Sequence, residues 1–127
     1  MLKLFFQNII FLNCVLFFEC IHSQNLIQNP SFEAHVNCPQ QISNLNKDIT
    51  HWFTPTKGTS DYFHACGVIM GIPSNFNGRQ YADFGKAYAG LYLYAAKDYR
   101  EYLQTELLME LERDRKYRIS FKPSRKI

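Results

Sequence analysis

Hydrophobic and polar residues alternate over several short stretches of the chain, and Pro or Gly residues separate these stretches. The clearest alternation covers Ala87 to Tyr94, where Ala or Leu at odd positions alternates with Tyr or Gly at even positions. This period of two predicts a β-strand. Leu26 to Phe32 and Ile49 to Phe53 predict two further short strands, the first at a sheet edge because Pro30 interrupts it. The stretch from Asp61 to Gln80 is rich in Gly, Asn and aromatic residues, which predicts an extended loop.

The stretch from Asp98 to Lys116 fits two patterns. Its apolar residues recur at helical spacing, and its Glu, Leu and Arg residues favour a helix. The alternation from Tyr102 to Leu107 predicts a strand instead, and a polar turn then leads to a second alternating stretch from Tyr117 to Phe121. The local pattern therefore leaves a helix and a hairpin of two long strands as alternatives.

The chain opens with the pattern of an export signal. Lys3 precedes an apolar stretch from Leu4 to Phe18, and Glu19 ends that stretch shortly before Ser23. The apolar part is shorter than the roughly 20 residues that a membrane-spanning helix needs. We expect residues 1–23 to be a cleaved signal peptide, with an uncleaved membrane anchor as the alternative. Residues 24–127, enough for one domain with a modest core, would then be secreted or displayed at the cell surface or outer membrane.

The charge of the protein is only mildly positive. It carries 14 Lys and Arg residues against 11 Asp and Glu residues, a formal net charge of +3, and the basic residues are scattered. Nucleic-acid-binding proteins instead cluster their basic residues on one face. We therefore expect no nucleic-acid partner, and membrane contact only through the signal or through downstream domains.

Two cysteines, Cys38 and Cys66, remain after the predicted signal peptide. An exported chain meets an oxidising environment, which favours a disulfide between them. The closed loop of about 28 residues would stabilise the fold by roughly 3 to 4 kcal/mol in the chain-entropy description. The competing hypothesis is a zinc site, because His35 and His64 lie close to the two cysteines in the sequence and zinc prefers such ligands.

Five pieces of the chain together suggest a family. In sequence order they are Asn29 to Glu33 (NPSFE), Trp52, Gly85 to Gly90 (GKAYAG), Tyr99 to Gln104 (YREYLQ) and Lys116 to Phe121 (KYRISF). Their order and spacing resemble the N-terminal extracellular domain of Bacteroidetes cell-surface proteins of the OmpA-family and gliding-motility-associated type. The chain is also similar to carbohydrate-binding modules with the galactose-binding-like jelly roll.

This resemblance implies an all-β fold, a jelly-roll β-sandwich. It also favours the hairpin over the helix after Asp98, because the corresponding segments of the family are strands. Family members continue through several more strands before the sandwich closes. We therefore expect residues 24–127 to be the first part of a sandwich that is incomplete at its C-terminus, as in a frameshifted fragment of a longer envelope protein.

The function that the resemblance implies is a non-enzymatic binding module that recognises a glycan or another cell-envelope ligand. Sugar-binding modules place aromatic faces against sugar rings and polar groups against the hydroxyls. A structural or adhesive spacer without a small ligand is the alternative, and core packing is the alternative for each aromatic residue. The candidate ligand-binding residues, all expected in loops, are Tyr62, Phe63, Phe76, Asn77, Arg79 and Tyr81, in a wider set that includes Trp52, Phe53, Asn75 and Gln80.

Two further expectations concern chemistry. Glu33 lies where the resembling modules hold a structural calcium ion, which takes several oxygen ligands. The sequence contains no nucleophile elbow, phosphate-binding loop or His-Glu-x-x-His motif. We therefore predict no catalytic residues and no enzymatic activity.

Overall fold

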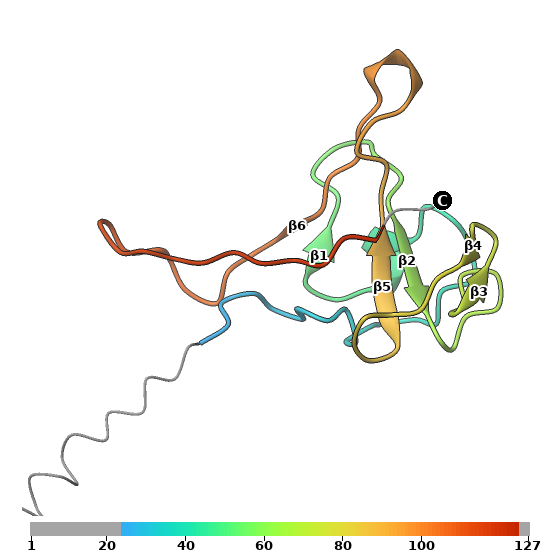
Figure 1. Ribbon diagram of the computed structural model, residues 1–127, viewed down its shortest axis with the longest axis horizontal. Coiled ribbons are helices and arrows are strands. Elements are labelled where there is room, and N and C mark those ends of the chain that lie inside the picture. The colour runs from blue at the N-terminus through green and yellow to red at the C-terminus, as the bar shows by residue number, and fades with distance from the viewer. Residues whose placement is uncertain (1–23, 125–127) are drawn as a thin grey trace, which may run out of the picture.

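The computed structural model describes residues 24–124 of the protein, and the predicted signal peptide lies outside the described residues. The described part is built mostly from short strands with little helix, which confirms the all-β class. No helix among the described residues is long and apolar enough to cross a membrane. In chain order the elements are α2 (Leu45–Asp48), β1 (Trp52–Phe53), β2 (Asp61–His64), β3 (Ser74–Asn75), β4 (Gly78–Arg79), β5 (Ala87–Gly90), the 3-10 turn η1 (Ala96–Asp98) and β6 (Gln104–Thr105) (Figure 1).

The longest pairing joins β2 and β5, which run antiparallel over four residue pairs, from Asp61 opposite Gly90 to His64 opposite Ala87. The core forms beside this pair, where Tyr62 is fully buried and packs with Leu45, Ile49 and Ala87. A glycine suits position 90, because a Cβ atom there would lie 2.9 Å from the ring of Phe63. The sequence thus leaves space for an aromatic ring against the backbone of β5.

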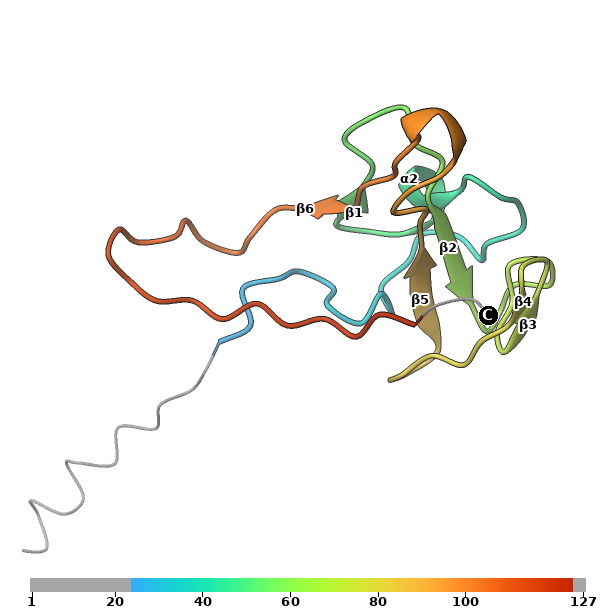
Figure 2. The ribbon, with the colours of Figure 1, turned by 45° about the horizontal axis from the view of Figure 1, so that its top comes forward.

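The other strands form two small antiparallel pairs. β1 pairs with β6, placing Trp52 opposite Thr105, and β3 pairs with β4 to form a hairpin at one side of the β2–β5 pair (Figures 1 and 2). An isolated bridge joins Ile27 to Leu107. The chain thus pairs with β1 through β6 and, two residues later, with the N-terminal segment. The described residues therefore contain three separate two-stranded sheets.

The predicted hairpin of residues 102–107 and 117–121 is wrong for the described chain. Gln104 and Thr105 of β6 pair with β1, and residues 117–121 belong to no strand. The predicted helix over Asp98 to Lys116 is also wrong. Within that range only Asp98 is helical, as the last residue of η1. Alternation predicts the extended conformation of a strand but does not identify its partner, and here the partner is the strand that carries Trp52.

After β6 the chain runs outward, turns and comes back as a long arm of residues 106–124 (Figures 1 and 2). Several apolar side chains of this arm are exposed, and Phe121 reaches 80% exposure. In a folded domain such a series of exposed apolar residues marks a surface that normally meets another element.

The other predicted elements are confirmed only in part. The strand at Ala87 to Tyr94 ends at Gly90, and of Ile49 to Phe53 only Trp52 and Phe53 form a strand. Leu26 to Phe32 contributes a single bridge. The loop predicted for Asp61 to Gln80 is wrong at its start, because Asp61–His64 is strand β2, in which three consecutive residues are buried. Aromatic residues there form the core rather than a loop surface. The predicted loop is also interrupted near its end by the short strands β3 and β4.

Candidate functional site

The Asn-Pro-Ser-Phe-Glu motif forms a turn that the Asn29 side chain holds together. The Asn29 amide donates to the carbonyl oxygens of Ala34 (2.8 Å) and Thr50 (3.0 Å), and its Oδ1 accepts the Ala34 N–H (2.9 Å). Asn29 itself has a positive φ of 50°, a conformation that asparagine tolerates better than most residues. The motif therefore has a structural role, which is to fix the turn beside β1.

An open cavity of about 220 Å³ lies next to this turn. The indole ring of Trp52 is fixed there on two sides: Nε1–H donates to the Asn29 carbonyl (2.9 Å), and the Phe32 ring lies 5.0 Å away between centroids. Two aromatic and three polar residues thus line one small volume. The cavity is lined by Gln28, His51, Trp52, Phe53 and Glu106.

The sequence identified only part of this lining. Trp52 and Phe53 were expected among the aromatic candidates, whereas Gln28, His51 and Glu106 were not. Gln28 and Glu106 are far apart in the sequence and meet because the segment after β6 lies beside the N-terminal segment, as the Ile27–Leu107 bridge shows. The sequence pattern does not specify the register in which these two segments pair, so it could not predict that Gln28 and Glu106 meet.

Two of the predicted ligand-binding residues belong to the core instead. Tyr62 is 0% and Phe63 2% exposed. The Tyr62 hydroxyl donates to the Phe32 carbonyl oxygen (2.9 Å), and the Phe63 ring stacks on Tyr88 with centroids 4.8 Å apart. Their place on β2 turns both side chains away from solvent, so neither offers a surface to a ligand.

The other four predicted residues lie on or next to the β3–β4 hairpin. Phe76 and Tyr81 are 52% and 61% exposed. The Arg79 guanidinium donates to the Tyr81 hydroxyl (2.7 Å) and lies over its ring, with the central carbon 5.4 Å from the centroid. Asn77 is partly buried, and its backbone N–H donates to the Asn75 side chain (2.9 Å). The hairpin therefore presents a second set of exposed aromatic side chains.

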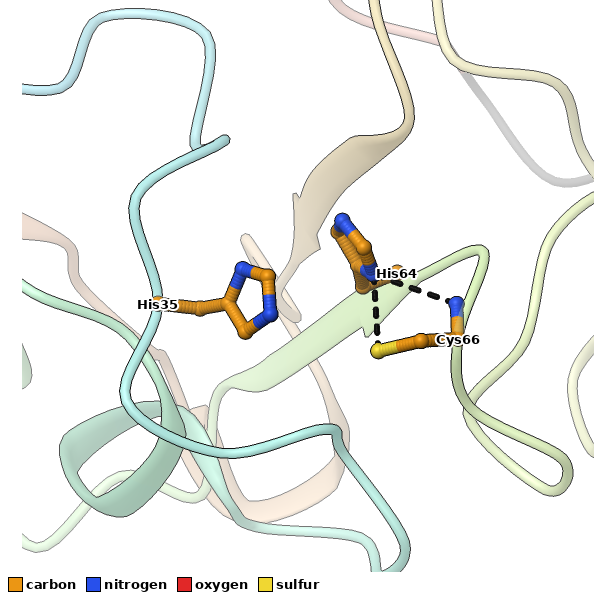
Figure 3. A group of neighbouring side chains, drawn as sticks. All are labelled: His35, His64 and Cys66. Atoms are coloured by element: carbon orange, nitrogen blue, oxygen red, sulfur yellow. Dashed lines mark hydrogen bonds between the residues drawn. The ribbon is translucent and has the colours of Figure 1, made fainter.

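The predicted disulfide between Cys38 and Cys66 is confirmed. It joins the segment before α2 to the turn after β2, with Cα atoms 5.7 Å apart. Both predicted histidines lie beside it: the rings of His35 and His64 are 4.3 Å apart between centroids (Figure 3). One ligating atom each of His35, His64 and Cys66 lie within 4.8 Å of one another.

The hydrogen bonds of the two imidazoles determine which nitrogen of each neutral ring has a free lone pair. His35 Nδ1 lies 2.9 Å from the Glu33 carbonyl oxygen, which can only accept, so Nδ1 carries the proton and Nε2 the lone pair. His64 Nδ1 accepts the Cys66 N–H (3.1 Å), so its proton is on Nε2. Burial lowers the pKa of His64, and the neighbouring His35 lowers it further.

Glu33, the predicted calcium ligand, has a visible structural contact. Its Oε1 accepts the backbone N–H of Lys86 (2.8 Å), next to Gly85, whose φ is +71°. Glu33 thereby connects the N-terminal turn to the start of β5. It does not belong to the His35, His64 and Cys66 group, and calcium at Glu33 stays a prediction.

Comparisons with family models, with curated proteins and with solved structures find no match for this chain. The geometry of the described residues is therefore the basis for the function proposed below.

Proposed function

We propose that this protein is a non-enzymatic binding module of a secreted or cell-surface protein, and that it recognises a glycan. The observation that carries the proposal is the cavity beside Trp52, which combines aromatic side chains with an amide, an imidazole and a carboxylate. Sugars need both kinds of group, because their rings have apolar faces and their edges carry hydroxyls.

The fixed position of Trp52 supports this use of the cavity. The indole Nε1–H is already bonded to the Asn29 carbonyl, so the ring can offer a ligand its face or edge but no free donor. Sugar hydroxyls would instead meet the polar lining residues Gln28 and Glu106, where the Gln28 amide N–H lies 3.5 Å from the Glu106 backbone carbonyl oxygen. A cavity of about 220 Å³ is smaller than the roughly 300 to 1,000 Å³ of drug-sized sites, which favours one or two sugar residues over a long chain.

The wider architecture in this proposal is the first part of a galactose-binding-like jelly roll. Its support is the sequence resemblance, the all-β content and the exposed apolar arm of residues 106–124. In a complete sandwich, further strands would cover such apolar side chains. The module would then belong to a longer envelope protein with additional domains.

The experiment is a glycan array followed by calorimetric titration of the best ligand. Phe53→Ala, at the 37% exposed aromatic residue of the cavity, should weaken binding about 10-fold or more, as expected for loss of an aromatic contact of about 1.4 kcal/mol or more. Tyr81→Ala is the matched variant on the hairpin and should leave affinity unchanged. If Tyr81→Ala weakens binding and Phe53→Ala does not, the hairpin is the site. If no glycan binds, the structural or adhesive spacer replaces this proposal.

A further inference from the structure

The two histidines beside the disulfide lead to an inference that is independent of glycan binding. The structure places His35, His64 and Cys66 together at the end of β2, and the disulfide brings Cys38 to the same place. Figure 3 shows the first three of these residues. Two imidazoles and two thiolates form the Cys₂His₂ ligand set that zinc prefers. We propose that the protein binds Zn²⁺ at these four residues when the disulfide is reduced, so that the disulfide and the metal are alternative cross-links of the same loop.

The positions of the ligand atoms support this site. The lone pair of His64 Nδ1 now accepts the Cys66 backbone N–H (3.1 Å), and the Cys66 Sγ lies 2.9 Å from the same nitrogen. Zinc would replace that N–H bond at His64 Nδ1, whereas the His35 Nδ1–H bond to Glu33 leaves His35 Nε2 for the metal. A backbone carbonyl that holds the second ring nitrogen is the usual support of a zinc-bound histidine. Zinc-bound N and S atoms lie roughly 3.5 Å apart, so the spread of up to 4.8 Å among His35, His64 and Cys66 requires side-chain movements of about 1 Å. The Cys38 sulfur, which the disulfide holds against the Cys66 sulfur, must also move away from it after reduction.

The chemistry of the change is balanced. A dithiol reductant gives two electrons and two protons to the disulfide, the S–S bond breaks to leave the Cys38 and Cys66 thiols, and the reductant becomes its own cyclic disulfide. Zn²⁺ then displaces the two thiol protons to solvent and takes both thiolates as ligands. The same two segments stay connected, now through the metal.

Access to the site is open from solvent. His35 and Cys66 are exposed, whereas His64 is 8% exposed and anchors the site on β2. An incoming ion therefore meets an exposed imidazole and a sulfur first. His51 is also exposed but lines the Trp52 cavity instead, which makes it a suitable control position.

The test is metal titration of the purified protein before and after reduction with a dithiol, which is then removed under anaerobic conditions. The probes are Zn²⁺ in competition with a chromophoric chelator, and Co²⁺, whose absorption reports thiolate ligands and tetrahedral geometry. The reduced protein should bind one equivalent of either metal, and the oxidised protein should bind at least about 100-fold more weakly, with no thiolate absorption.

Histidine variants separate this site from simple binding to free thiols. His35→Ala, at an exposed position, should weaken zinc binding to the reduced protein by about 10-fold or more. His51→Asn is the control for zinc binding alone and should leave the zinc affinity unchanged, because His51 does not belong to the ligand group and asparagine tolerates the positive φ of 69° at that position. If reduction unfolds the chain, zinc should restore its circular dichroism. Equal binding by the oxidised and reduced proteins, equal binding without His35, or failure of zinc to restore the fold would overturn the proposal.

Discussion

The indole Nε1–H of Trp52 donates a 2.9 Å hydrogen bond to the backbone carbonyl oxygen of Asn29. The first residue of the Asn-Pro-Ser-Phe-Glu motif thereby fixes the orientation of the only tryptophan of the chain. The same Asn29 carbonyl also accepts the Phe32 N–H at 3.1 Å. The motif and the aromatic cavity are consequently one structural unit, and a change in the turn should reach the cavity.

Substitution of Asn29 should test this unit. Asn29→Ala removes three side-chain hydrogen bonds. It also places alanine, which has no side-chain hydrogen bonds to favour the left-handed conformation, at a positive φ. We therefore expect the unfolding free energy to fall by about 2 to 3 kcal/mol. Asn29→Gly removes the same bonds without the conformational strain and should be less destabilising by about 1 kcal/mol. Urea denaturation followed by Trp52 fluorescence measures both, and an Asn29→Ala protein as stable as wild type would contradict the structural role.

Truncation to alanine should greatly destabilise the fold at Tyr62 and hardly affect it at Tyr81. Tyr62 is fully buried and Tyr81 is 61% exposed. Tyr62→Ala should cost about 3 to 5 kcal/mol, the range for large core aromatics, and unfold much of the population. Tyr81→Ala should change stability by less than about 0.5 kcal/mol. Thermal unfolding followed by circular dichroism compares the two variants. A Tyr62→Ala protein as stable as wild type would contradict the core position of Tyr62 and make it a candidate ligand-binding residue again.

The buried carboxylate of Glu101 should make stability depend on pH. Burial alone would raise the pKa of Glu101, but donors from the Tyr92 backbone, the Thr59 hydroxyl and backbone, and the Tyr99 hydroxyl lie at 2.8 to 3.0 Å and hold the pKa below its ordinary value. A depressed native pKa adds stability that is present above the unfolded-state pKa of about 4.3 and is lost as the pH falls through the native value.

Glu101→Gln should therefore cost about 1 to 3 kcal/mol at pH 7, because the amide cannot accept all of these bonds. The variant should also flatten the decline of stability below about pH 4.5. Glu110→Gln, at an exposed glutamate of the arm, is the control and should keep the wild-type pH profile. The measurement is a series of urea titrations between pH 3 and pH 7. Parallel profiles for wild type and Glu101→Gln would show that Glu101 does not contribute.

The Cys38–Cys66 disulfide should stabilise the fold by roughly 3 to 4 kcal/mol through the 28-residue loop that it closes. Reduction in the presence of a metal chelator should lower the urea midpoint by the corresponding amount. The Cys38→Ser/Cys66→Ser variant should match the reduced wild type and should not respond to the reductant. A reductant effect on the double variant would mean that the loss of stability has another cause.

The local sequence pattern predicted the presence of short strands better than it predicted which strands pair with each other. The disulfide followed from two cysteines in a chain predicted to be exported, and the strand at Ala87 followed from its alternation. The partner of the Gln104–Thr105 strand did not, because a period of two specifies the faces of a strand and not its neighbour. The β2 strand was missed since Tyr62 and Phe63, flanked by Asp61 and His64, lie in a stretch whose Gly and Asn residues indicate a loop.

The candidate site shows the same division. Aromatic composition suggested Trp52 and Phe53, which line the cavity, and equally suggested Tyr62 and Phe63, which are core. Composition cannot separate the two cases, because burial depends on which strand face meets the core. His35 and His64 meet because the disulfide between Cys38 and Cys66 joins their two segments. The sequence predicted that disulfide, but not the distance between the two imidazole rings.

Glycan binding at the Trp52 cavity can be located by mapping backbone amide chemical shifts during titration with the strongest ligand from the glycan array. We expect saturable shifts concentrated at residues 28, 51–53 and 106. Saturable shifts concentrated at residues 76–81, or no saturable shifts with any glycan, would contradict it.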